Sequence, residues 1–149
     1  MYELEFKVRD YECDLQGIVN NANYQHYMEH TRHEFLLSRG ISFSALHDAG
    51  RDAVVARIRI DYKIPLRSGD EFICTLRLIK ENVRYVFYQN ILRKRDDKLC
   101  ARARIDTVCV QDGNLIAGCP DLDKLILCCA TLFCVLHYPA LSVILPYHC

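Results

Sequence analysis

The sequence has no net charge, because Lys and Arg together number 19 and so do Asp and Glu. A chain without a basic or acidic excess gives no reason to expect nucleic acid or a membrane as a partner. No internal repeat and no linker is visible, and 149 residues are enough for one hydrophobic core but not for two. We therefore expect a single folded domain, which we place at residues 1–124.

The nine cysteines include no pair spaced as Cys-x-x-Cys, and their number is odd. This pattern indicates neither a zinc site nor a disulfide framework, so we expect no metal and no other cofactor. The N-terminus also lacks a basic stretch followed by an apolar one, which a secretory signal would require. Reduced thiols in a cytoplasmic protein are the expectation. Cys13 has no histidine near it in the sequence to activate it as a nucleophile, and is interpreted as a small, half-buried residue.

After Lys124 the sequence contains no Asp, Glu, Lys or Arg. The apolar run at 125–136 is shorter than the roughly 20 residues that a membrane-spanning helix requires, so a buried element or an interface segment is favoured over a span. An altered reading frame is a further explanation of the abrupt change in composition. Residues 125–149 are therefore treated as an atypical, uncharged C-terminal tail.

Apolar residues near the N-terminus change their spacing from that of a strand to that of a helix. Residues 2–8 alternate apolar with charged side chains, which predicts a strand with one face in water. Residues 10–20 break the alternation and form a loop. Asparagines at 20, 21 and 23 are candidate N-caps of a following helix, which ends near Gly40. The apolar stripe that predicts this helix consists of Tyr24, Tyr27, Met28, Thr31, Phe35 and Leu36.

Strands dominate the rest of the domain. Alternating patterns predict strands near residues 56–62, 72–78, 83–93 and 99–109, with a short helical turn at 42–47. Tight turns between the later strands make them antiparallel neighbours. The single long helix can bury its stripe only against one face of that sheet, so the predicted fold class is α+β. Small residues such as Ala101 and Ala103 suit a close approach of the helix.

The loop before the helix contains the most informative side chain, Asp14. A carboxylate that faces a helix N-terminus across a bound carbonyl group suits acyl transfer. It can attack the carbonyl or activate water, while free backbone N–H groups hold the developing oxyanion. The alternative is that Asp14 only caps the turn at Gly17.

Three sequence blocks in a fixed order carry a family resemblance. They are residues 8–24, which include Asp14, residues 32–36 (Arg-His-Glu-Phe-Leu) and residues 65–70 (Pro-Leu-Arg-Ser-Gly-Asp). Over residues 4–122 the chain resembles the hotdog-fold acyl thioesterases of the 4-hydroxybenzoyl-CoA thioesterase family. The likeness is to the branch of small bacterial acyl-CoA or acyl-ACP thioesterases and their plant plastid relatives. It implies a hotdog fold, in which a curved antiparallel sheet of about five strands wraps a long central helix.

The resemblance also implies the chemistry of the site. Asp14 corresponds to the family's catalytic carboxylate, a nucleophile or general base, and the amides near Asn23 and Tyr24 would polarise the thioester oxygen. The expected substrate is an acyl-CoA or acyl-ACP thioester. The expected assembly is a homodimer or homotetramer with active sites between subunits. Substrate contacts are expected from Gly17, Val19, Asn20, Asn21, Arg67 and Ser68.

Two other functions remain open on the same fold. A dehydratase would need a histidine and a carboxylate that converge on the substrate, and no histidine lies in the Asp14 loop. A non-catalytic protein that binds acyl thioesters would release no thiol.

Several charged residues have a simpler interpretation than catalysis. Glu29 lies three residues before Arg32 on the predicted helix, and either pairs with it at the surface or faces the site. The histidines at 26, 30 and 33 lie off the apolar stripe and are interpreted as solvent-facing. The arginines at 57 and 59 suit a phosphate group, but as outward residues of a strand they are interpreted as solubilising.

Overall fold

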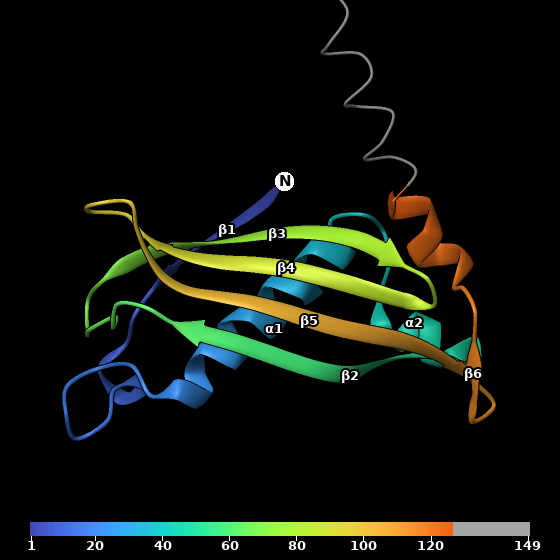
Figure 1. Cartoon of the computed structure of the whole chain (residues 1–149), viewed down its shortest axis with the longest axis horizontal. Helices are drawn as coiled ribbons and strands as arrows, with labels where there is room; N and C mark the ends of the chain where they lie inside the picture. The colour runs from blue at the N-terminus through green and yellow to red at the C-terminus, as the bar shows by residue number, and fades with distance from the viewer. Residues whose placement is uncertain (127–149) are drawn as a thin grey trace, which may run out of the picture.

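One curved antiparallel sheet forms most of the molecule (Figure 1). The structure, a computed structural model, describes residues 1–126. The order of the strands is β1-β3-β4-β5-β2, and the short β6 pairs with β5, so β1 and β2 lie at the two edges. The strands are β1 (Tyr2–Lys7), β2 (Arg51–Tyr62), β3 (Glu71–Glu81), β4 (Arg84–Arg93), β5 (Lys98–Gln111) and β6 (Asn114–Ile116).

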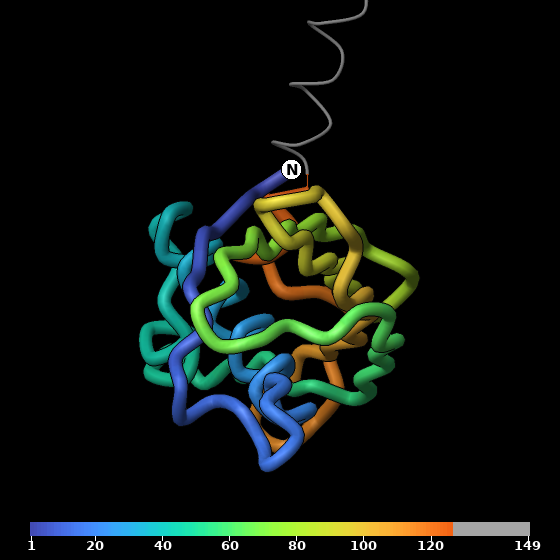
Figure 2. The backbone as a smooth tube through the Cα atoms, turned by 90° about the vertical axis from the view of Figure 1, so that its left-hand side faces the viewer, coloured from blue at the N-terminus to red at the C-terminus, as the bar shows by residue number. Residues whose placement is uncertain are grey.

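A single long helix, α1 (Asn21–Leu37), lies along the concave face of the sheet, and the strands curve around it (Figures 1 and 2). Asn20 is its N-cap, because the side chain accepts a hydrogen bond from the Ala22 amide at 3.0 Å. Ser42 caps the short helix α2 (Phe43–Asp48) in the same way, and a 3₁₀ turn, η1 (Asp10–Glu12), follows β1. The predicted hotdog fold is therefore confirmed, with β6 and the 3₁₀ turn as additions.

The predicted apolar stripe of α1 is buried against the sheet, as expected from its spacing. Aromatic rings anchor its N-terminal half. The Tyr27 ring lies 4.9 Å from that of Phe72 on β3, and Phe72 stacks on Phe6 of β1 at 5.1 Å. On β5, Ala101 and Ala103 are also buried beneath the helix. This packing holds α1 toward the β1–β3 side of the sheet.

Arg32 departs from the sequence interpretation, because its side chain is buried rather than paired with Glu29 at the surface. Only 7% of Arg32 is exposed, and no ion pair joins it to Glu29. Position 32 is one helical turn from Met28 and from Leu36, so it continues the apolar stripe. Its polar head required a partner from another element, which helical spacing alone does not reveal.

The predicted tail begins within the described residues but continues beyond them. Residues 120–126 are helical, and both Leu122 and Leu125 belong to the hydrophobic core. Most of the segment predicted at 125–149 lies outside residues 1–126. Within that described part of the chain, no helix is long and apolar enough to span a membrane.

Replacing Phe72 tests the aromatic anchor of α1. Phe72 is fully buried, so Phe72→Ala should lower the free energy of unfolding by about 3–5 kcal/mol. The matched control is Leu115→Ala on β6, because Leu115 is 60% exposed and a change within about 0.5 kcal/mol is expected. Urea denaturation measures both. A loss below about 1 kcal/mol for Phe72→Ala would contradict this account of the core.

Candidate active site

Asp14 lies at the tip of a closed turn that precedes α1. Its amide donates to Ile18 O and its carbonyl accepts from Gly17 N, both at 2.9 Å. Gly17 has a φ of +70°, a conformation that glycine adopts without strain. The carboxylate accepts a bond from the Gln16 amide at 2.8 Å and is otherwise exposed. Asp14 therefore caps its own turn, and the capping bond also fixes the direction of its carboxylate.

The segment on either side of this turn is bonded to the start of α1. The backbone oxygen of Glu12 accepts from the Asn20 amide at 2.9 Å and from the Asn23 side chain at 2.7 Å. The Glu12 carboxylate accepts from the hydroxyl of Tyr27 at 2.7 Å. A bridge between Cys13 and Val19 closes the base of the turn. These bonds place Asp14 beside the helix N-terminus.

Two amides in the first turn of α1 already have acceptors. Ala22 N donates to the Asn20 side chain, and Asn23 N donates to Asn20 O at 2.9 Å. The Asn21 amide has no acceptor among residues 1–126. Its carbonyl accepts from the Tyr62 hydroxyl at 3.2 Å, which holds this first helical residue against β2. The Asn21 amide is therefore an unbonded donor at the helix start, at the positive end of the helix dipole.

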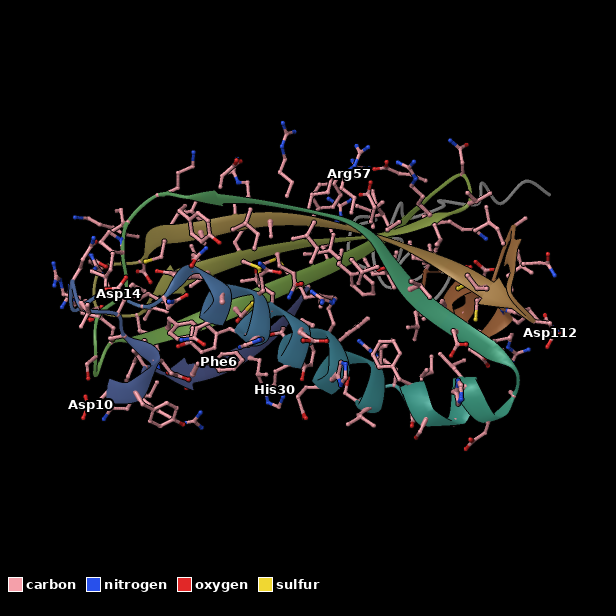
Figure 3. The ribbon with its side chains drawn as sticks, turned by 90° about the horizontal axis from the view of Figure 1, so that it is seen from below. Phe6, Asp10, Asp14, His30, Arg57 and Asp112 are labelled. Atoms are coloured by element: carbon pink, nitrogen blue, oxygen red, sulfur yellow. The ribbon has the colours of Figure 1, made fainter. Side chains whose placement is uncertain are left out.

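Asp14 and Asn21 line the same cavity, which has a volume of about 320 Å³. Figure 3 shows Asp14 at the end of the molecule where α1 begins, far from Asp112 at the other end. The cavity lies between the Asp14 turn, the first turn of α1 and the end of β2. Its lining residues are Asp14, Ile18, Val19, Asn21, Tyr24, Tyr62, Lys63, Ile64 and Pro65.

The other predicted site residues do not line this cavity. Gly17 and Arg67 lie just outside the cavity, where Arg67 Nη1 is 3.4 Å from Gly17 O. Asn20 caps the helix. Asn23 and Ser68 line a separate groove beside β1, and the Ser68 hydroxyl bonds to Asp10. The structure thus brings Val19, Asn21 and Tyr24 to Asp14, but not Asn23 or Ser68.

Tyr24 forms part of the wall of the Asp14 cavity. Its side chain is buried, and its hydroxyl accepts a bond from the Leu66 amide at 3.0 Å. Burial raises the pKa of the Tyr24 phenol, so the ring stays neutral at physiological pH. The ring also meets that of Tyr62 at 5.3 Å. Tyr24 therefore shapes the cavity floor and ties the 65–70 turn to α1.

The helix-facing side of β2 is incompletely covered. Ile58 pairs in register with the buried Ile105, so both point toward α1, yet 40% of Ile58 is exposed. Val55 and Tyr62 also line cavities on this side and are 42% and 48% exposed. We call this strip the α1–β2 seam, defined by Val55, Ile58 and Tyr62. It leads from the Asp14 cavity along the helix.

A second cavity of about 200 Å³ lies at the other end of the seam. The side chains of Glu29 and Arg32 line it from α1, so Glu29 faces this cavity and not the one with Asp14. Sequence reasoning missed the buried position of Arg32, although its place on the apolar stripe was a usable signal. We call this the Arg32 cavity, and its lining residues are Glu29, Arg32, His33, Leu36, Phe43, Ala53, Val55, Phe87, Thr107 and Leu122.

Comparison with known proteins supports a family assignment. A family model described as the thioesterase-like superfamily matches residues 8–121. The chain is similar to the acyl-acyl carrier protein thioesterase ATL3, chloroplastic, of Arabidopsis thaliana, with 38% identity over 93 residues. That alignment covers 62% of this chain and 49% of the plant protein, so the chain spans about half the length of this relative.

Solved structures show the same fold. A hypothetical protein from Aquifex aeolicus superposes with a TM-score of 0.78 at 28% identity, over 85% of this chain and 99% of that one. A 1,4-dihydroxy-2-naphthoyl-CoA thioesterase from Synechocystis superposes with a TM-score of 0.79 at 19% identity, over 93% and 98%. Because the family model covers most of the sequence and the fold agrees, the chain belongs to the thioesterase-like superfamily.

Proposed function

We propose that the protein is a thioesterase that hydrolyses an acyl-CoA or acyl-ACP thioester to a free acid and a thiol. The observation that carries the proposal is the shared cavity of the Asp14 carboxylate and the unbonded Asn21 amide. A carboxylate and an oxyanion donor on one cavity are the two groups that acyl transfer to water requires. The family membership and the likeness to an acyl carrier protein thioesterase support the same reaction.

In this reaction the thioester oxygen accepts a hydrogen bond from the Asn21 amide. Negative charge that develops on that oxygen is stabilised there by the N–H group and by the helix dipole. Resemblance to the family pointed to the amides near Asn23 and Tyr24. We assign the role to Asn21 because the Asn23 amide already donates to Asn20 O.

Asp14 supplies the second half of the chemistry by one of two routes. As a nucleophile its carboxylate attacks the carbonyl carbon, the thiolate leaves, and water then hydrolyses the resulting mixed anhydride. As a general base it removes a proton from water, which attacks the carbonyl directly. A single turnover in oxygen-labelled water tests the nucleophilic route. Unlabelled acid, which takes its second oxygen from Asp14, identifies this route with water attacking the Asp14 carbonyl of the anhydride. The general-base route gives labelled acid, as does attack of water on the acyl carbonyl of the anhydride.

The acyl chain lies along the α1–β2 seam. The seam begins at Tyr62 beside the Asp14 cavity, and Ile58 presents exposed apolar surface to its middle. Apolar surface left uncovered on the inner side of a sheet is stabilised when a hydrocarbon chain covers it. The CoA or carrier-protein end of the substrate then projects from the opening near Lys63 and Arg67, whose cationic side chains suit phosphate groups.

Asp14→Asn is the direct test of the catalytic assignment. The amide keeps the size of the side chain and can still accept the Gln16 bond, but it is a poor nucleophile and a poor base. We expect kcat/KM for acyl-CoA hydrolysis to fall by about 10²–10⁴, with the free energy of unfolding nearly unchanged. Asp112→Asn, in the turn at the other end of the molecule, is the matched control and should retain full activity. A thiol-release assay that finds near-normal turnover for Asp14→Asn would refute the assignment.

We also propose that the protein assembles as a homodimer through the open edge of β2. β2 is a twelve-residue edge strand, and Val54, Val55 and Ile58 beside that edge are each at least 40% exposed. Long, apolar edge strands readily pair with another strand, and pairing of two β2 edges would form one continuous sheet. A second copy would then cover the seam from the side, as an active site between subunits requires.

Val54→Asp tests this interface without altering the seam. Val54 pairs with Val108 on the outer face of the sheet, away from the two cavities. Burying an unpaired carboxylate in the interface should raise the dimer dissociation constant at least about tenfold. Sedimentation equilibrium measures the constant, with Leu115→Asp on exposed β6 as the control. An unaltered dimer in Val54→Asp, or a wild-type protein that stays monomeric, would exclude this interface.

A further inference from the structure

The Arg32 cavity lies at a defined distance from the thioester along the proposed path of the acyl chain. The start of α1 faces the end of β2 in the Asp14 cavity, and the later part of α1 faces the beginning of β2 in the Arg32 cavity. Eleven residues separate Asn21 from Arg32, which corresponds to roughly 16 Å along a helix. An acyl chain of medium length that starts at Asp14 therefore ends beside Arg32.

Arg32 is a buried cation with few partners. Nη1 donates to the Gln89 side chain at 3.0 Å, and the guanidinium carbon lies 6.0 Å from the centre of the Phe87 ring. A guanidinium has five N–H donors, and among residues 1–126 no carboxylate lies within ion-pairing distance of this one. Burial lowers the pKa of Arg32, and the negative charge of Glu29 opposes that shift. The group remains charged, since an arginine does not lose its proton in proteins.

The unused donors of Arg32 are open to the cavity. Among residues 1–126, the one buried side-chain nitrogen or oxygen without a partner is Arg51 Nε. The other nitrogens of Arg32 are therefore not sealed in the core, and the side chain lines the cavity wall. Glu29 lines the same cavity and supplies an acceptor, while Leu36, Val55 and Phe87 make much of the remaining wall apolar.

We infer that the Arg32 cavity binds a hydroxyl group carried on the acyl chain, at the end far from the thioester. A hydroxyl oxygen can accept from the Arg32 guanidinium, and its proton can be donated to the Glu29 carboxylate. A methyl end would displace water from Arg32 and leave its donors without acceptors. A carboxylate end would pair with Arg32 but would also face the charge of Glu29. The inference rests on the proposed thioesterase function and names the acyl class that the site prefers.

Paired substrates test the preference on the full-length protein. We compare kcat/KM for dodecanoyl-CoA and ω-hydroxydodecanoyl-CoA, with the decanoyl and tetradecanoyl pairs to allow for chain length. The wild-type protein should favour the hydroxylated member of at least one pair by about tenfold or more, because a site built to bond a hydroxyl rejects an analogue without one. A ratio near one for every pair would overturn the inference.

Substitutions in the Arg32 cavity test whether that cavity causes the preference for the hydroxylated substrate. Arg32→Met keeps the length of the side chain and removes its donors, so the ratio should fall to about one. Glu29→Met changes an exposed residue and should lower the ratio in part. This variant remains an independent test if Arg32→Met impairs folding. The control is Arg77→Met on the exposed side of β3, which should keep the wild-type ratio. A ratio that survives both cavity substitutions would also overturn the inference.

A binding measurement distinguishes failure of this inference from failure of the proposed function. If no substrate is hydrolysed, the thioesterase proposal fails, and calorimetry with ω-hydroxydodecanoate and dodecanoate then decides the cavity by itself. Tighter binding of the hydroxy acid to wild type, lost in Arg32→Met, supports the hydroxyl site. Equal binding of the two acids refutes it.

Discussion

The buried Glu12 side chain is the contact on which the geometry of the site depends. Only 8% of Glu12 is exposed, and its carboxylate accepts bonds at 2.7 Å from the Tyr27 hydroxyl and from the Arg9 amide. A carboxylate inside a protein is costly unless such bonds replace water. Burial, followed by the bond to Glu12, raises the pKa of Tyr27, so the phenol keeps the proton that it donates. One residue thus fixes the Asp14 turn to the second turn of α1 and holds Asp14 beside the helix start.

The same aromatic packing that secures α1 also leaves the α1–β2 seam open. Tyr27, Phe72 and Phe6 hold the helix toward β1 and β3, whereas on the β2 side the Tyr24 and Tyr62 rings meet only at the start of the helix. The inner face of β2 is therefore left exposed at Ile58. A helix centred on the sheet would bury more apolar surface but would close the seam. Asymmetric packing is a general way for a small domain to combine a stable core with a binding cleft.

Spacing in the sequence predicted the elements of the fold because each signal was local. The stripe of α1, its Asn20 cap and the alternation in β1 depend on neighbours within a few residues. The Asp14 turn was recognised as a motif for the same reason. The proposed oxyanion donor was less predictable. Three asparagines precede or begin the helix, and Asn21 differs from Asn23 in the cavity that it lines and in the bond from the Asn23 amide to Asn20 O, neither of which spacing reveals.

The apolar stripe gave a signal for the burial of Arg32, but the sequence could not identify its partner, which is distant in the chain. Gln89, on β4, bonds to the Arg32 guanidinium and also donates to Met28 O at 3.0 Å, so one side chain spans the helix and the sheet. A charged residue on an apolar stripe is predicted to lie at the surface unless a buried polar partner such as Gln89 is known. Burial of an arginine at this position also carries a desolvation penalty. A methionine or leucine of similar volume would pack against Phe87 without a desolvation penalty, and exchanges of that kind for buried ions are often neutral or stabilising. Packing alone therefore does not favour Arg32, and the proposed hydroxyl ligand would supply an acceptor for the donors that Gln89 leaves unused.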